Sequence, residues 1–536
     1  MHEIELKFLV PESRLKSLMR QAQVKSSKYT QLAAHYYDTS DQNLAQAGIG
    51  LRIRKEGDTW VQTIKAGGDG IAARLEHNAI LDNEQVQAML DNNELMPDLT
   101  IYKDTPIAPA LEDFKLKKLA KKLTRQYVTD VQRTTRLLIE NSKEEDSNSI
   151  EIAYDHGEVI HGNDDTQRDL IQEIEFELVS GDVDFLFTTA KTWCKRYKLC
   201  LSTVTKAERG GLLIKGQNYS PAVSADLSQL TVNKDSSAPA FIRAAVHNCL
   251  LHILPNSSAI VAGSDDNEHI LQLTIGLNRL QSALQAFASF SDEINPDWLP
   301  ILKQTATLLA DYQELAYLAT YIDPKLQSHG APAVDWTVDI AALKIQPIDV
   351  VSANDFQLTL LELIAFTMSD PNLEPKADKT AVAKLTKTLS KQYATFIETE
   401  QSLENKHVTN DELDSEALAS ADPKNLNLKS KDHDQTQHDL YCQLVDLHYA
   451  SEFTSLLLSK KKAKKKAKTW LKRLVKAQQS LAQYRTHTQY QRYYERRSVT
   501  DTNALYGTGW FAAMLKRDFK RAKKRLAKVQ DSSTFW

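Results

Sequence analysis

The sequence has few cysteines and no long apolar stretch. Only four of its 536 residues are cysteine, and no two form a Cys-x-x-Cys pair. Four such residues are too sparse for a disulfide framework or a structural zinc site, which favours a reducing compartment. No apolar run approaches the ~20 residues of a membrane helix, and a patterned strand begins at residue 3, which leaves no room for a signal peptide. We therefore expect a cytoplasmic protein with no membrane partner.

Glycine is scarce in the second part of the chain. Twelve of the 17 glycines lie before residue 217, where turns between short strands would need them. Alternation of apolar and polar residues in this first part predicts eight or so strands in a sheet that closes or folds over. The alternating segments are Leu51–Arg54, Trp60–Lys65, Arg74–Leu81, Tyr127–Glu140, Ile150–Tyr154, Val159–His161, Ile171–Val179 and Leu201–Lys206. Helical patterns interrupt them at Glu12–Gln23, Asn83–Leu90 and Val183–Tyr197.

The second part has the periodicity of long helices. Its length, added to that of the first part, is too great for one hydrophobic core. A stretch rich in Ser, Asn and Asp separates the two, so we predict a first domain over residues 1–212, a linker over 213–237 and an α-helical bundle over 238–536. Residues 399–438 are polar and acidic with little apolar periodicity, which is typical of an exposed loop or a disordered insertion.

The small net charge of −4 hides a strongly basic end. Between Ser459 and Trp536 there are 22 Lys and Arg against 4 Asp and Glu, a local charge of 22 − 4 = +18. Within it, residues 460–468 read KKKAKKKAK, and apolar residues recur around this run at three- and four-residue steps. A packed helix with an exposed basic face explains both patterns, and such a face attracts polyanions. Nucleic acid would fit the charge alone.

Charged residues alternate with apolar ones in several strands of the first part. Glu3, Glu5 and Lys7 share one face of the first strand, and its apolar residues share the other. One such strand is typical of an exposed edge, but the pattern repeats at Arg52, Arg54, Lys65, Glu151, Asp155, Glu173, Glu175 and Glu177. If the sheet closes, these charges converge in a lumen, where they must be paired, hydrated or bridged by a ligand. Carboxylates suit Mg²⁺ and basic side chains suit phosphate, so both signs together indicate a polyanion bound with a divalent metal.

These motifs, taken in order, resemble the CYTH domains, or triphosphate tunnel metalloenzymes. The resemblance covers about residues 1–212 and is carried by residues 3–7 (EIELK), 36–39 (YYDT), 50–54 (GLRIR), 63–65 (TIK), 173–177 (EIEFE) and 206–210 (KAERG). It implies an α+β chain in which an eight-stranded antiparallel β-barrel precedes the helical bundle. The family's tunnel binds a triphosphate with Mg²⁺ or Mn²⁺.

The resemblance also implies roles for single residues. Carried over by motif position, the phosphate-binding set is Lys7, Arg52, Arg54, Lys65, Arg133 and Lys206, with Arg136 as the rival of Arg133. The metal-binding set is Glu3, Glu5, Glu76, Asp155, Glu173 and Glu175, with Glu177 facing the same way. Glu5, Lys7 and Glu175 are the expected catalytic residues. Either Glu175 or a second metal ion would orient the attacking water.

The second part resembles a CHAD domain, a helical bundle often found after CYTH and associated with polyphosphate. The resemblance covers about residues 238–536 and is carried by residues 269–280, 447–449 and the ending from Gly509 to Trp536. His269 and His448 are more typical of packed or surface histidines than of ligands. The basic end, with Arg517, Lys520, Arg521, Lys524 and Arg525, is the better candidate for a polyphosphate surface.

Together the resemblances predict a metal-dependent inorganic triphosphatase that cleaves tripolyphosphate to diphosphate and phosphate. Two alternatives stay open: a non-catalytic polyphosphate-binding scaffold, and a tunnel enzyme acting on thiamine triphosphate or a nucleoside triphosphate. Carboxylates on both early and late strands count against the scaffold, because a pure anion binder would gain from fewer negative charges. Nucleic acid is not the expected partner.

Overall fold

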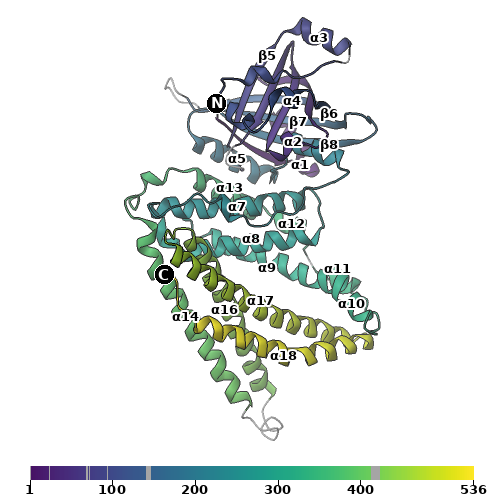
Figure 1. Ribbon diagram of the computed structural model, residues 1–536. Coiled ribbons are helices and arrows are strands. Elements are labelled where there is room, and N and C mark those ends of the chain that lie inside the picture. Colours follow the sequence, from purple (N-terminus) through teal and green to yellow (C-terminus); the bar gives the residue numbers. More distant parts are fainter. Residues whose placement is uncertain are drawn as a thin grey trace. The chain divides into compact units, whose positions relative to one another are not determined.

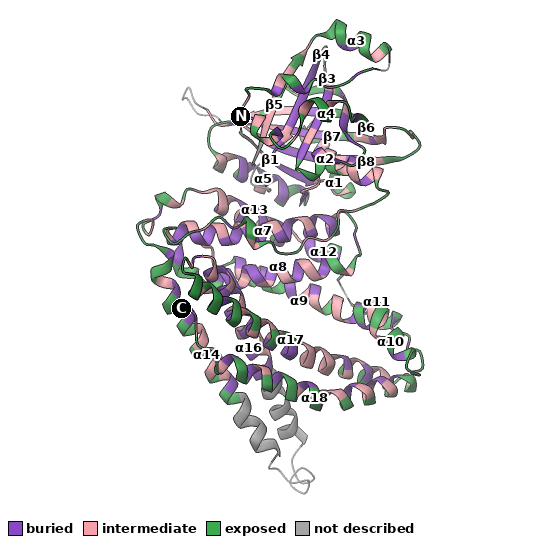
Figure 2. Cartoon of the chain, in the orientation of Figure 1, coloured by how far each residue is buried: buried purple, intermediate pink, exposed green. Residues whose placement is uncertain are grey.

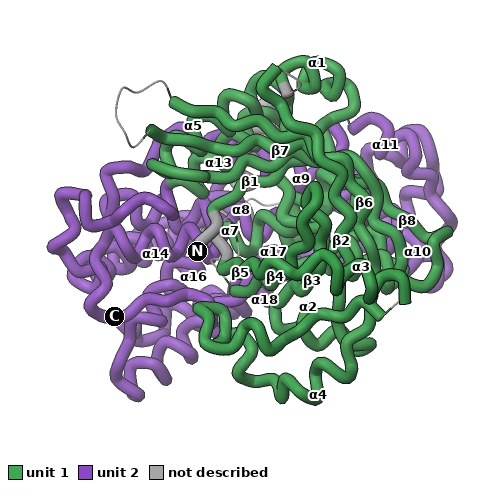
Figure 3. Tube along the Cα trace, turned by 90° about the horizontal axis from the view of Figure 1, so that it is seen from above, with its two compact units in different colours: residues 1–224, 250–272, 347–365 green, residues 225–249, 273–346, 366–536 purple. Residues whose placement is uncertain are grey.

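A computed structural model describes residues 2–22, 25–67, 71, 73–92, 94–140, 147–343, 345–411 and 423–536. The chain divides into two compact units (Figure 3). Unit 1 comprises residues 1–224, 250–272 and 347–365, and unit 2 comprises residues 225–249, 273–346 and 366–536. In the described residues no helix is long and apolar enough to cross a membrane.

Unit 1 contains one antiparallel sheet, part of which is labelled in Figure 1. Its strand order is β5-β4-β3-β2-β6-β7-β8-β1-β9. Its strands are β1 (His2–Leu9), β2 (Lys28–Thr39), β3 (Ile49–Glu56), β4 (Thr59–Ala66), β5 (Ala73–Leu81), β6 (Leu123–Ile139), β7 (Ser149–His161), β8 (Arg168–Ser180) and β9 (Cys200–Leu201). β1 pairs also with β5, through three residue pairs from His2↔Leu75 to Ile4↔Ala73. With this pairing each of the strands β1–β8 has a neighbour on both sides, and the predicted α+β class with an N-terminal antiparallel sheet is confirmed. The two-residue strand β9 is an addition that pairs with β1.

The hydrophobic core of the sheet lies on its outer face. Phe8 of β1 packs edge-on against Phe176 of β8, with ring centroids 5.6 Å apart. Phe176 in turn contacts Trp193 of helix α5 (Val183–Tyr197) at the same centroid distance. Because neighbouring residues in a strand point to opposite faces, this packing turns the charged residues of β1 and β8 to the inner face. The other helices before residue 215 are α1 (Glu12–Ala22), α2 (Asn43–Gln46), α3 (Asn83–Asp91), α4 (Leu116–Ala120) and α6 (Lys206–Ile214).

Three strand predictions differ from the structure. Residues 150–154 and 159–161 were expected as separate strands, but both belong to β7. Gly157 hides the continuity, because a Cβ there would lie 2.1 Å from the Asp130 carbonyl oxygen of β6, so only glycine allows the strands this close. The strand predicted for Leu201–Lys206 was wrong after Leu201: Thr205 caps helix α6 by accepting from the Glu208 backbone N–H, and Lys206 begins that helix. β2 was missing from the predicted strands, although it contains the Tyr36–Thr39 motif.

The remainder of the chain is helical, as predicted. Its helices are α7 (Ala238–Val261), α8 (Asn267–Ala286), α9 (Trp298–Tyr317), α10 (Asp323–Gln327), α11 (Thr337–Ala341), α12 (Pro347–Val351), α13 (Asn354–Met368), α14 (Ala381–Asp411), α16 (Pro423–Ser455), α17 (Lys461–Ser498) and α18 (Leu505–Gln530). The loop expected over residues 399–438 was wrong where α14 and α16 extend into it. Many residues there are good helix formers without an apolar stripe, which periodicity alone misses. The centre of that stretch, residues 412–422, lies outside the described residues.

Helix α17 has the two faces expected from its sequence. Ala467, Trp470, Leu474, Ala477 and Leu481 are buried and form its packed stripe. The lysines of the run at residues 460–468 are all exposed (Figure 2). The basic run is therefore the solvent side of a packed helix.

Candidate active site

Strand register brings the charged residues of β1, β6, β7 and β8 together on the inner face of the sheet. Lys7 of β1 lies directly opposite Glu175 of β8. Asp155 of β7 lies between Arg133 of β6 and Glu173 of β8. Directly opposed side chains are close enough to interact, so four strands contribute to one charged cluster.

Three carboxylates form the centre of this cluster. Single oxygens of Asp155, Glu173 and Glu175 all lie within 4.8 Å of one another. Lys206 Nζ is 2.6 Å from Asp155 Oδ2 and 2.9 Å from Glu175 Oε1, and it also contacts Glu173 Oε1. Lys7 Nζ is 3.2 Å from Glu173 Oε1 and 3.0 Å from Glu175 Oε1. Arg133 donates two hydrogen bonds to Asp155 in a bidentate arrangement, with Nε 2.7 Å from Oδ1 and Nη2 2.6 Å from Oδ2.

Burial and ion pairing act in opposite directions on the pKa values of Asp155, Glu175 and Lys206. Asp155 and Glu173 are fully buried. Burial alone would raise the pKa of Asp155, but Lys206 and Arg133 lower it below its ordinary value. The pKa of Glu175 is held well below its ordinary range by Lys206 and Lys7, against the same burial effect. Burial alone would lower the pKa of Lys206, yet the neighbouring carboxylates hold it well above normal.

The acidic centre fits a hard divalent cation. Its ligand atoms are carboxylate oxygens, which Mg²⁺ and Mn²⁺ prefer. Glu173 Oε2 is buried and has no hydrogen-bond partner among the residues that the structure describes. A buried carboxylate oxygen without a partner is costly, and a cation would satisfy it. Asp155, Glu173 and Glu175 can therefore hold the metal, while the identity of the metal is open.

A second group of charges lies on β3, β4 and β5. Arg52 Nη1 donates to the Tyr36 hydroxyl at 3.3 Å, and the buried Arg52 Nε has no partner. Arg54 Nε donates to Glu56 at 2.7 Å. Lys65 is paired with the directly opposite Glu76, at 3.0 Å. This group contains donors for phosphate oxygens outside the acidic centre.

Sequence reasoning placed Tyr36 in the motif at residues 36–39 but gave it no role in the site. Its ring stacks on Tyr127, with centroids 4.7 Å apart. Burial alone would raise the pKa of the Tyr36 phenol, but Arg52 lowers it, with contributions from Lys206 and Arg54. Arg52 contacts the phenol directly, and Lys206 and Arg54 act on it electrostatically. The signal that could have found it is the position of Tyr36 directly opposite Arg52 in the register.

Packing against β6 fixes the base of Lys206. The Tyr127 hydroxyl donates to the Ala207 carbonyl oxygen at 2.8 Å. A Cβ on Gly210 would lie 2.2 Å from the Tyr127 ring, so helix α6 approaches β6 this closely only with glycine there. These contacts hold the backbone next to Lys206 in place, and the long side chain of Lys206 extends to the acidic centre.

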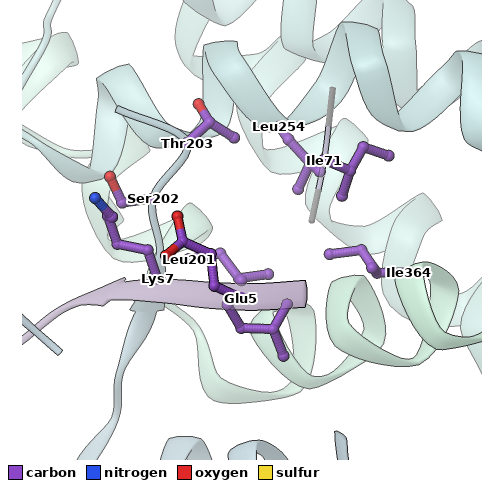
Figure 4. A pocket seen from close by; sticks show the side chains of 9 residues that line it. Glu5, Lys7, Ile71, Leu201, Ser202, Thr203, Leu254 and Ile364 are labelled. Atoms are coloured by element: carbon purple, nitrogen blue, oxygen red, sulfur yellow. The ribbon is translucent and has the colours of Figure 1, made fainter. Parts of the chain in front are cut away.

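The structure does not bring all predicted residues to the centre. Glu76 is paired with Lys65 in the second group, and Glu5 lines a pocket beside β1 with Lys7 (Figure 4). Glu177 lies opposite Glu5, and burial raises its pKa. The Glu3 side chain lies outside the described residues. Of the two rival arginines, Arg133 contacts the centre, and Arg136 donates instead to the Gln21 carbonyl oxygen of α1.

The pocket in Figure 4 has one polar and one apolar side. Glu5 and Lys7 of β1, with Ser202 and Thr203, form the polar side. Leu201, Leu254 and Ile364 supply apolar contacts, and Ile71 and Leu6 complete the lining. Leu254 and Ile364 come from α7 and α13, so helical segments of unit 1 contribute to the surroundings of β1.

The basic surface of unit 2 differs from the acidic centre because its cations are exposed to solvent. It consists of exposed cations on α17 and α18, namely Lys460, Lys461, Lys462, Lys464, Lys465, Lys466 and Lys468 with Arg517, Lys520, Arg521 and Lys524. His269, in unit 1, is buried and bonded to Ser264 and to the Ser220 carbonyl oxygen, which agrees with the packed histidine expected.

Comparison with known proteins agrees with both resemblances. Residues 1–210 match the CYTH domain family, and residues 244–487 match the CHAD domain family. The chain is 32% identical over 181 residues to an inorganic triphosphatase of Haemophilus influenzae, an alignment covering 33% of this chain and 44% of that relative. The chain thus spans less than half the length of this relative.

Two solved structures share only low similarity. The CHAD domain of the plant Ricinus communis is 16% identical, with a TM-score of 0.43 over 58% of this chain and 99% of that one. A Hippeastrum protein described as a putative adenylyl cyclase with dominant triphosphatase activity is 15% identical, with a TM-score of 0.28 over 40% of this chain and 96% of that one. TM-scores this low add no argument to the strand pairings and helices described above.

Proposed function

We propose, on the premise that this chain belongs to the CYTH family over residues 1–210 and to the CHAD family over residues 244–487, that it is a metal-dependent inorganic triphosphatase. The substrate is tripolyphosphate and the products are diphosphate and phosphate. One observation carries the proposal: three buried carboxylates meet Lys7, Arg133 and Lys206 in one cluster, on the same sheet as Arg52 and Arg54. A site with both signs of charge suits a phosphate chain bound together with a cation.

The metal supplies charge neutralisation to the phosphoryl group when it is bound. Asp155, Glu173 and Glu175 would hold it, as Mg²⁺ or Mn²⁺, and we keep Glu3, Glu5 and Glu76 as further candidate ligands. Lys7, Arg52, Arg54, Lys65, Arg133 and Lys206 are the proposed phosphate-binding residues. The buried Arg52 Nε offers a donor with no partner for a phosphate oxygen.

Glu175 is the proposed orienting residue for the attacking water. Its pKa is held well below the ordinary range, so at neutral pH it is ionised and accepts hydrogen bonds. A carboxylate with so low a pKa is a weak base and is poorly matched to removing a proton in the transition state. We therefore assign it the positioning of water rather than general-base catalysis.

The experiment that tests the function is phosphate release from tripolyphosphate, with and without Mg²⁺ or Mn²⁺. ATP and thiamine triphosphate in the same assay separate the inorganic triphosphatase from an enzyme acting on an organic triphosphate. Metal-dependent release that is fastest from tripolyphosphate supports the proposal. Binding without hydrolysis of any of the three would instead support the non-catalytic scaffold.

The exposed basic surface of α17 and α18 is the proposed polyphosphate-binding surface. Long polyphosphate can contact many of its exposed cations at once, and such binding weakens steeply as salt rises. We also keep the domain bounds 1–212 and 238–536 and the cytoplasmic location as proposals. All four cysteines are free thiols, and three of them are buried, which suits a reducing compartment.

A further inference from the structure

The Lys206 ammonium lies where a metal held by the three carboxylates would have to lie. Its Nζ is within 3 Å of one oxygen from each of Asp155, Glu173 and Glu175. Those three residues are the group whose oxygens come within 4.8 Å of one another. A divalent cation contacts carboxylate oxygens at ~2.0–2.6 Å, so it cannot share this space with the ammonium.

We propose that Lys206 is a built-in counter-ion of the metal centre, which must leave before the metal can bind. The inference rests on the proposed function, because it concerns the same carboxylates. In the substrate-free protein the ammonium satisfies the acidic centre. Metal binding replaces one cation with another, and the displaced lysine becomes available to the phosphate chain.

Charge balance gives the reason. Lys7, Arg133 and Lys206 together carry +3, and Asp155, Glu173 and Glu175 together carry −3, so the cluster is neutral. Exchanging the Lys206 ammonium for a divalent cation would leave a buried cluster with a charge of +1, which is costly in a low-dielectric environment. A bound triphosphate supplies the missing negative charge. The arrangement therefore makes metal bind weakly without a phosphate chain, and coupling of this kind is reciprocal.

The side chain of Lys206 can leave without a movement of its helix. The helix is held by the contacts of Tyr127 with Ala207 and Gly210, whereas the lysine has a flexible four-carbon stem. A destination lies nearby, because Tyr127, which holds the residue next to Lys206, stacks on Tyr36, and the Tyr36 hydroxyl accepts from Arg52. A lysine released toward Arg52 would add a third cation to the Arg52 and Arg54 group.

The test is a titration of the full chain with Mn²⁺ in the absence of phosphate. The electron paramagnetic resonance signal of free Mn²⁺ measures how much of the metal is bound. Lys206→Met should bind Mn²⁺ at least about tenfold more tightly than the wild type, because a competing cation is removed. Lys206→Arg, which keeps the charge, should bind as weakly as the wild type. Lys7→Met should show a smaller gain, since Lys7 contacts two of the three carboxylates.

Lys191→Met is the matched control, because Lys191 forms a long, partly exposed ion pair with Glu362 elsewhere in unit 1. It should leave Mn²⁺ affinity unchanged. Unchanged or weaker binding in Lys206→Met would overturn the inference, and Lys206→Gln gives the same test if the methionine variant does not fold. Failure here with intact hydrolysis by the wild type rejects only the counter-ion role. A gain in affinity in a protein that hydrolyses no triphosphate rejects only the proposed function.

Discussion

The two parts of this chain use positive charge in opposite ways. In the barrel, Lys7 is buried, Arg133 and Lys206 are partly buried, and each contacts at least two carboxylates. On α17 and α18, the lysines and arginines are exposed and stand at a density that attracts polyanions from solution. Each cation of the acidic centre has specific carboxylate partners, whereas the exposed cations are many and interchangeable. The difference predicts one site sensitive to single substitutions and one surface sensitive to salt.

The largest expected effect on stability comes from removing a cation of the acidic centre. Arg133→Met removes one cationic partner of two buried carboxylates and should destabilise the protein by about 3–5 kcal/mol, because the two lysines that remain leave one buried negative charge unbalanced. Arg168→Met removes a pair with Glu158 in which both side chains are nearly half exposed, and it should cost only about 0–1 kcal/mol. Chemical denaturation of both variants measures the contrast. Equal destabilisation would show that burial is not what distinguishes the two pairs.

The next effect concerns hydrolysis itself. Glu175→Gln should lower the rate of phosphate release from tripolyphosphate by about 100-fold or more, since it removes a metal ligand and the proposed orienting group. Glu158→Gln, on the outside of β7, should leave the rate unchanged. Steady-state phosphate release at saturating Mg²⁺ decides between them. An active Glu175→Gln enzyme would remove this residue from the mechanism.

Charge reversal tests the exposed side of the comparison. Replacing Lys520, Arg521 and Lys524 of α18 with glutamate should weaken long-chain polyphosphate binding by about tenfold or more at low salt, and by less as salt rises. Hydrolysis of tripolyphosphate should not change. Binding isotherms at several salt concentrations measure both trends. Polyphosphate affinity that does not respond to salt would contradict a binding role for this surface.

The smallest effect is a pH dependence. The folded-state pKa of Asp155 lies below its unfolded value of about 3.9, so its ion pairs contribute stability that is complete above that value and is lost as pH falls. Asp155→Asn lacks this contribution at every pH. The stability difference between wild type and variant should therefore be constant near neutral pH and shrink by about 1 kcal/mol or more below pH ~4. Thermal melting across that range provides the measurement, and a difference that grows on acidification would reverse the assigned sign.

Strand alternation explains how much of the site could be predicted from the sequence. The charged faces of β1, β3, β7 and β8 are visible as period-two patterns, and closure of the sheet turns them to one interior. Register is not visible in the same way, so the sequence could separate metal ligands from phosphate ligands only by sign of charge. The structure shows them interleaved, with Lys206 in contact with all three carboxylates. The role of Tyr36 was not predicted for the same reason: its position opposite Arg52 depends on how β2 and β3 pair, which the alternation of residues within each strand does not show.

Local chemistry also limited the prediction of elements. Lys206 follows apolar residues at strand spacing, but the Thr205 cap starts a helix there. Gly157 interrupts the alternation of apolar and polar residues in β7, but the strand continues through it. Because glycine has no side chain, β7 can approach β6 closely at this position. In both cases one residue with a specific conformational role outweighs the surrounding pattern.

The pairing between β1 and β5 gives the barrel an uneven wall. Among the described residues three pairs join these strands, whereas β6 and β7 are paired along thirteen residues from Tyr127 to Ile139. Amide protons along this short junction should exchange with solvent sooner than those of β6 and β7, since fewer neighbouring bonds must open together. Strand β1 thus contributes to the wall of the site, and its short pairing with β5 is expected to open more readily than the pairing of β6 with β7. Breathing at this junction would admit a bulky anion sideways, without passage through either end of the tunnel.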